Sequence, residues 1–171
     1  MSGPIACALP IDPEVLQSRS QTEAGPMLNA DDALPAKVLI VDDNEQNVEL
    51  LQAYLEEIEG TESRIARDGL EALQAVAQDP PDLILLDIMM PNMSGFEVCK
   101  QLKENPTTRN IPIIVVTALN ESSDYERGME AGADDFLTRP FNRVEFIARV
   151  RSLLRIREMR RAFNRRKSTQ E

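Results

Sequence analysis

Charged and hydroxyl side chains follow four of the apolar runs in this chain. Two adjacent carboxylates, Asp42 and Asp43, end the run VLIV, and a third, Asp87, ends the run LILL. A hydroxyl, Thr117, ends the run IIVV, and a cation, Arg139, follows the short run FLT. Burying an ionised carboxylate costs free energy unless it is paired or binds a cation. These side chains are therefore expected at an edge of the core, each held there by the run before it.

The three carboxylates suit the binding of a divalent cation. Held close together they repel one another, and burial raises their pKa values, so a cation would relieve the repulsion. The chain contains no histidine, which excludes histidine ligands and histidine acid–base catalysis, and an all-oxygen site favours Mg²⁺ or Ca²⁺ over zinc. With a cation bound, a free oxygen of Asp87 could attack phosphorus and form an acyl phosphate. The Thr117 hydroxyl and a cationic side chain would help to neutralise the phosphoryl charge.

Each of these residues also has an ordinary structural explanation. An Asp-Asp pair is often a turn or a cap, a threonine at a strand end reflects β-propensity, and an Arg-Pro pair after a strand is usually a loop. Asp87 is the hardest to explain as packing, because it lies between apolar residues on both sides. The combination of one such element on each of four strand ends is what predicts a site.

The segments that carry these residues alternate between strand and helix patterns. The pattern implies an α/β fold in which helices cover both faces of a parallel sheet, with right-handed crossovers and three layers. In such folds ligands bind beyond the carboxyl ends of the strands, so the polar residues are expected on one rim. The predicted strands are 38–41, 63–66, 82–87, 111–118 and 134–138, and the predicted helices are 44–60, 69–78, 94–105, 122–132 and 142 to about 161.

Charge and composition divide the 171 residues into three parts. Residues 1–35 contain five prolines, one basic and five acidic side chains and no sustained period, and are expected to be a disordered tail. Residues 36–153 form the predicted domain, and residues 154–171 a basic helical extension and tail. The domain is strongly acidic, which argues against nonspecific nucleic-acid binding. There is no membrane-length apolar run and no secretory pattern, so a cytoplasmic protein is expected.

Four motifs resemble the receiver domain of two-component response regulators, in the CheY-like superfamily. They are VLIVDDNE (38–45), DLILLDIMMPNMSGFEVCKQLK (82–103), IPIIVVTA (111–118) and GADDFLTRPF (132–141). The resemblance covers roughly residues 36–153 and is especially close to the receivers of diguanylate-cyclase-type regulators. It implies a flavodoxin-like (βα)5 fold with a five-stranded parallel sheet in the order 2-1-3-4-5.

The resemblance also implies roles for individual residues. Asp87 would accept a phosphoryl group from the phosphohistidine of a sensor histidine kinase or phosphotransfer protein. Asp42 and Asp43 would hold Mg²⁺ (or Mn²⁺) together with Asp87 and the backbone carbonyl of Met89. Thr117 would bond the phosphoryl group as a catalytic and switch residue.

Three further positions match the family or depart from it. Phe136 occupies the aromatic switch position, and Gly95 the glycine position of the loop after the phosphorylation site. Arg139 would contact the phosphoryl group, but the family has lysine here, and the exchange is not conservative because arginine is longer, planar and forked. The family pattern makes the bond before Pro140 cis, as X–Pro bonds allow.

Three classes of function compete. The first is a phosphorylatable switch that acts through the face formed by the predicted fourth helix, fifth strand and fifth helix. The second is a pseudo-receiver, a constitutive interaction module in which Arg139 marks the loss of switching. The third is an aspartyl phosphatase, which is weak because such enzymes carry a second aspartate where this chain has Met89. We therefore expect no enzyme activity beyond the domain's own phosphorylation and dephosphorylation.

The last helix and the water path give two further expectations. Ile156, Met159 and Phe163 continue a helical stripe past the expected end of the domain, as a frayed helix end, a dimer seam or a connector to a missing domain. Too few residues follow the domain for a DNA-binding or cyclase domain. In the family the side chains at Met89 and Leu119 flank the path of hydrolytic water, and two apolar groups predict a long-lived phosphoaspartate.

Overall fold

The computed structural model describes residues 34–118 and 122–168. The predicted tail, apart from its last two residues, lies outside the described residues, and so does Leu119. The chain from Leu34 onward forms one compact unit.

Five parallel strands form a single sheet in the order β2-β1-β3-β4-β5. This order and the parallel pairing confirm the predicted fold class. Val41 of β1 pairs with Leu86 of β3, and Leu86 pairs with Val115 of β4, so the residues that follow these strands come out at one edge of the sheet. The strands are β1 (Ala36–Val41), β2 (Thr61–Ala66), β3 (Leu83–Leu86), β4 (Ile113–Thr117) and β5 (Asp135–Thr138).

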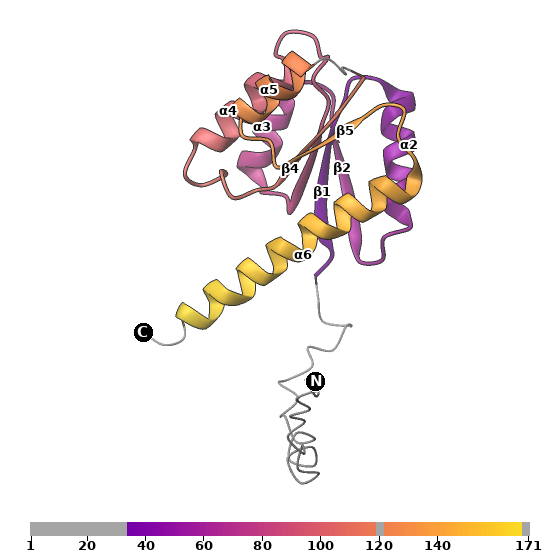
Figure 1. The fold of residues 1–171 in the computed structure, drawn as a ribbon. Coiled ribbons are helices and arrows are strands. Elements are labelled where there is room, and N and C mark those ends of the chain that lie inside the picture. Colours follow the sequence, from indigo (N-terminus) through magenta and orange to yellow (C-terminus); the bar gives the residue numbers. More distant parts are fainter. Residues whose placement is uncertain (1–33, 119–121, 169–171) are drawn as a thin grey trace, which may run out of the picture. The chain divides into compact units, whose positions relative to one another are not determined.

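Helices cover both faces of the sheet (Figure 1). One core lies between the sheet and α3, α4 and α5, and the other between the sheet and α2 and α6. The central strands are buried on both sides, which explains their continuous apolar runs. The helices are α2 (Glu45–Glu56), α3 (Gly69–Gln78), α4 (Gly95–Glu104), α5 (Ser122–Glu130) and α6 (Arg143–Ser168).

Side-chain caps fix the starts of α2 and α6. The Asn44 side chain accepts a hydrogen bond from the Asn47 N–H, and Asn142 accepts one from the Glu145 N–H, so both predicted caps form. The predicted end of α2 at Gly60 is wrong. The helix ends at Glu56, and Gly60 adopts a φ of +73° in the turn that leads into β2, a conformation that favours glycine.

Helix α6 continues well past the expected domain end and is tied to the body near its middle. Leu154 is buried, and the Arg157 Nε donates to the Asp82 Oδ1 at 2.7 Å. The other Asp82 oxygen accepts from the backbone N–H of Lys37 at the start of β1. The boundary expected between residues 153 and 154 therefore lies inside a continuous helix. No helix among the described residues is long and apolar enough to cross a membrane.

The Arg157–Asp82 pair should contribute measurably to stability, because the Asp82 side chain is only 8% exposed and that of Arg157 only 16%. Arg157→Ala removes the cation from a buried carboxylate and should lower the free energy of unfolding by about 1–3 kcal/mol in urea titrations at neutral pH. Arg160→Ala, at an exposed position three residues later, is the matched control and should change it by about 0.5 kcal/mol or less. Equal effects of the two substitutions would contradict a stabilising role for the pair.

Candidate functional site

The three predicted carboxylates meet at the carboxyl ends of two neighbouring strands. Asp42 and Asp43 follow β1, and Asp87 follows β3, where its N–H donates to the Val41 carbonyl at 2.9 Å and continues the ladder between the strands. One oxygen from each carboxylate lies within 4.8 Å of the others. The register of β1 and β3 thus forces the carboxylates together, as the sequence predicted.

Asp42 is the most enclosed member of this cluster. Its side chain is 1% exposed, and both of its oxygens accept hydrogen bonds. Oδ1 accepts from the Asn44 N–H at 2.9 Å and from the Asn47 side chain at 3.3 Å. Oδ2 accepts from Arg139 at 2.8 Å. Asp87 is also buried, at 6% exposed, whereas Asp43 is exposed to solvent.

Arg139 reaches the cluster from β5. Its backbone N–H donates to the Thr117 carbonyl at 2.8 Å, which fixes the main chain beside the end of β4, where Thr117 is buried. The following peptide bond, before Pro140, is cis, as the family resemblance implied. The structure therefore brings Thr117 and Arg139 to the same rim as the carboxylates.

Two contacts at this site were missed from the sequence. The pairing of Arg139 with Asp42 depends on the direction of a long side chain across two strands, which residue spacing does not reveal. Asn47 was not considered, although its place in the first turn of α2, three residues after the cap, gave a signal. An amide there points back toward the strand end that precedes the helix.

Burial and neighbouring charges raise the pKa of Asp87 to about 6. Removal from water is the largest cause, and the negative charges of Asp42 and Asp43 act in the same direction. Arg139 and a hydrogen bond from the Ile88 N–H lower the pKa in part. The site thus holds more negative charge than its own cation offsets, which is the situation a divalent cation would relieve.

The loop after Asp87 is held close against α4 by a glycine. A β-carbon at Gly95 would lie 2.2 Å from the Asp87 backbone oxygen, so no other residue fits without a shift. The Gly95 N–H donates to the Ile88 carbonyl at 3.1 Å. Met89 lies on this loop, and its side chain is 63% exposed and lines the same surface hollow as Asp43.

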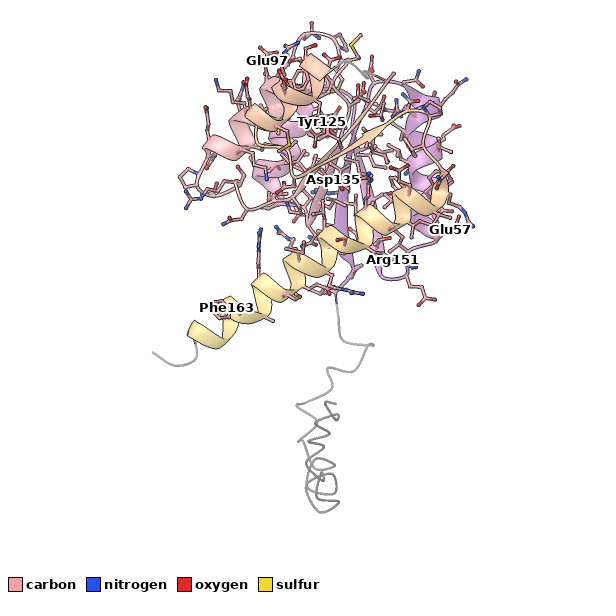
Figure 2. The ribbon with its side chains drawn as sticks, in the orientation of Figure 1. Glu57, Glu97, Tyr125, Asp135, Arg151 and Phe163 are labelled. Atoms are coloured by element: carbon pink, nitrogen blue, oxygen red, sulfur yellow. The ribbon has the colours of Figure 1, made fainter. Side chains whose placement is uncertain are left out.

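Phe136 lies on β5 and packs under helix α5. Its ring centroid is 4.7 Å from that of Tyr125, which Figure 2 labels on α5. A β-carbon at Gly128 would lie 2.1 Å from the Phe136 ring, so this helical glycine makes room for the aromatic side chain. Sequence reasoning did not identify Gly128, and an isolated glycine inside a predicted helix was the available signal.

Comparison with known proteins assigns this chain to a family. The sequence profile of the response regulator receiver domain matches residues 38–151. The chain belongs to the response regulator receiver family, which confirms the resemblance drawn from its motifs.

Individual relatives agree with this assignment. The response regulator PleD from Caulobacter vibrioides is 52% identical over 124 residues, which cover 72% of this chain and 27% of PleD. The chain thus spans about a quarter of the length of this relative. A response regulator structure from Chloroflexus aurantiacus is 38% identical, with a TM-score of 0.67, over 70% of this chain and 98% of that one. The Mn²⁺-bound form of the response regulator Rcp1 is 30% identical, with a TM-score of 0.62, over 70% of this chain and 91% of that one.

The raised pKa of Asp87 predicts that Asp87→Asn increases stability in a pH-dependent way when a chelator keeps the protein free of metal. Because folding disfavours the ionised carboxylate, the penalty is present above pH 6 and fades as the pH falls toward the unfolded pKa of 3.8. The variant should be more stable than the wild type by about 1–3 kcal/mol at pH 7.5. This difference in stability between variant and wild type should be smaller at pH 4.5.

The measurement is urea unfolding at both pH values, with Glu49→Gln, an exposed position on α2, as the control. The control should show little change at either pH. A variant at Asp87 that is no more stable than the wild type at pH 7.5 would contradict the burial argument.

Proposed function

We propose that this receiver accepts a phosphoryl group on Asp87 from the phosphohistidine of a sensor histidine kinase or a phosphotransfer protein. The observation that carries the proposal is the buried Asp87 carboxylate, placed within 4.8 Å of two others at the strand ends, with Thr117 and Arg139 on the same rim. The regulator relatives support it. We take residues 36–153 as the receiver and residues 154–171 as a basic helical extension and tail.

The residues of the cluster fit a Mg²⁺ or Mn²⁺ ion. Asp42, Asp43 and Asp87 offer hard oxygen ligands, and the backbone carbonyl of Met89 would add a fourth. Burial and the charges of Asp42 and Asp43, which together raise the pKa of Asp87, support the fit, and the Mn²⁺-bound relative supports it by analogy. When bound, the ion would neutralise charge on the carboxylates and the phosphoryl oxygens.

The chain's own residues carry the transfer step. One oxygen of ionised Asp87 forms a bond to phosphorus while the bond from phosphorus to the histidine nitrogen of the donor breaks. The Thr117 hydroxyl donates a hydrogen bond to a phosphoryl oxygen, and the Arg139 guanidinium offsets its charge. The buried strands β3 and β4 hold Asp87 and Thr117 in place.

Phosphorylation is read out through Thr117 and Phe136. Val115, two residues before Thr117, pairs with Phe136 on β5, so a shift at the end of β4 reaches the ring. Phe136 contacts Tyr125 on α5, which connects the site to the α5–β5–α6 face. This face, or the C-terminal part of α6, is the candidate surface for protein interaction or homodimerisation. Exposed apolar side chains on both support that assignment: Tyr125, Met129, Ile156, Met159 and Phe163.

The alternative is a pseudo-receiver that acts as a constitutive interaction module. The observation that favours it is the Arg139–Asp42 pair, which places a cation on one of the candidate metal ligands. In either case the domain works as a regulator in the cytoplasm and not as an enzyme on other substrates. Its acidic surface disfavours nucleic acid as a direct partner.

Incubation with acetyl phosphate and Mg²⁺ separates these two functions. The wild type should incorporate one phosphoryl group by intact-protein mass spectrometry, and Asp87→Asn should incorporate none, because the amide is not nucleophilic. Oligomeric state is read in the same samples by light scattering. An unlabelled wild type, shown to be folded by circular dichroism, would favour the pseudo-receiver.

The phosphorylated protein should lose its phosphoryl group slowly. Met89 is apolar and exposed beside Asp87, so it does not orient a water molecule for attack. Met89→Gln should shorten the half-life several-fold, while Met129→Gln, an exposed methionine on α5, should leave it unchanged. Phosphate release after acetyl phosphate is removed measures it, and a half-life of seconds in the wild type would refute the expectation.

A further inference from the structure

Three methionines lie in the loop between β3 and α4, and Met89 differs from the other two. Met90 and Met93 are half-buried and pack against the core, whereas the Met89 side chain is 63% exposed. Two hydrogen bonds to the Ile88 carbonyl, from the N–H groups of Met90 and Gly95, hold the main chain of this loop. A chemical change at the Met89 sulfur would therefore leave both the core and the loop intact.

Met89 also lines a surface hollow beside the candidate site. The hollow has a volume of about 460 Å³, enough for several water molecules, and Asp43, Ser94 and Arg127 are among its other lining residues. Because an oxygen of Asp43 lies within 4.8 Å of one of Asp87, water in the hollow lies next to the proposed phosphorylation site. The Met89 thioether is only a weak hydrogen-bond acceptor, so it does little to orient this water.

We propose that Met89 is a site of reversible oxidation by peroxides, and that its sulfoxide shortens the lifetime of the phosphorylated state. The inference rests on the proposed function, because that lifetime is the lifetime of phosphorylated Asp87. In the oxidation step an S–O bond forms as the O–O bond of the peroxide breaks. With hydrogen peroxide the departing oxygen takes the proton of the transferred oxygen and leaves as water. The sulfur loses two electrons and the peroxide gains them.

Oxidation changes the polarity of the hollow. A sulfoxide is polar where the thioether is apolar, and its oxygen accepts a hydrogen bond from a water molecule in the hollow. That water is then held for attack on phosphorus, with the Asp87 carboxylate as the leaving group. One such hydrogen bond in the transition state corresponds to about two- to tenfold in rate. Met89→Gln places an amide oxygen at the corresponding point of the side chain, so it mimics the oxidised state.

Other sulfur atoms in the described part of the chain do not compete for this role. Cys99 is fully buried, and burial raises the pKa of its thiol to about 11, so it holds little of the thiolate that reacts with peroxides. Met129 and Met159 are 52% and 60% exposed, but neither lines the hollow beside Asp87. Their oxidation would not place an oxygen near the phosphoryl group.

The test uses the full chain, with and without treatment by hydrogen peroxide, loaded afterwards with acetyl phosphate and Mg²⁺. Peptide mass spectrometry identifies the oxidised methionines, circular dichroism checks the fold, and phosphate release after removal of acetyl phosphate gives the half-life. Oxidation of Met89 should shorten the half-life of the wild type by about two- to tenfold. Treatment with methionine sulfoxide reductase should restore it.

Three variants isolate the residue, and the peroxide response of each is measured against its own untreated sample. Met89→Leu removes the sulfur and should show no response. Met129→Leu removes a comparably exposed sulfur on α5 and should show the full response of the wild type. Met89→Gln should show the half-life of the oxidised wild type without any peroxide.

The outcomes distinguish this inference from the function beneath it. A wild type that is folded, phosphorylated and oxidised at Met89 but keeps its half-life overturns the inference and leaves phosphorylation of Asp87 standing. An equal response in Met89→Leu overturns it too, because another oxidised group, such as Cys7, would then be the cause. Resistance of Met89 to oxidation, or unfolding on oxidation, also overturns it. Failure of the wild type to take up a phosphoryl group overturns the proposed function together with this inference.

Discussion

The forced approach of three carboxylates is the constraint on which the rest of the structure depends. Adjacent parallel strands end level with one another, so Asp42, Asp43 and Asp87 lie together whatever their charges prefer. Burial of the preceding strands supplies the free energy that offsets this repulsion, because their apolar side chains are almost fully buried on two faces. A fold with less core beneath this rim would relax by moving the carboxylates apart.

Other features of the rim are responses to this repulsion. Arg139 brings a positive charge to Asp42, and the start of α2 directs the Asn44 N–H and the Asn47 amide at the same carboxylate. Gly95 lets α4 approach the Asp87 backbone closely enough to hold the loop. Burial first, and then the charges of Asp42 and Asp43, raise the pKa of Asp87, and a divalent cation bound at this rim would relieve both.

The sequence was sufficient for whatever depends on pattern along the chain. Apolar runs that end in acids located the rim, and alternation of strand and helix located the layers, while the strand order came from the family motifs. The contacts that were missed depend on where long side chains turn in three dimensions: Arg139 toward Asp42, Arg157 toward Asp82, and the Phe136 ring into the space at Gly128. The end of α2 was misplaced because a glycine with positive φ serves a turn as readily as a helix end.

The tie between Arg157 and Asp82 attaches helix α6 to the body of the domain at one point near its middle. The helix starts three residues after Pro140, where Arg143 pairs with Glu57 at the end of α2, and its 26 residues span roughly 39 Å at 1.5 Å per residue. The Arg157–Asp82 hydrogen bond holds the helix near its middle, at the end of the sheet where β1 and β3 begin. The part of the helix beyond the tie extends roughly 16 Å at 1.5 Å per residue, so a tilt of about 5° about the tie would move its end by roughly 1–2 Å. A tilt about this tie would displace Phe163 more than Met159, because Phe163 lies farther along the helix from Arg157.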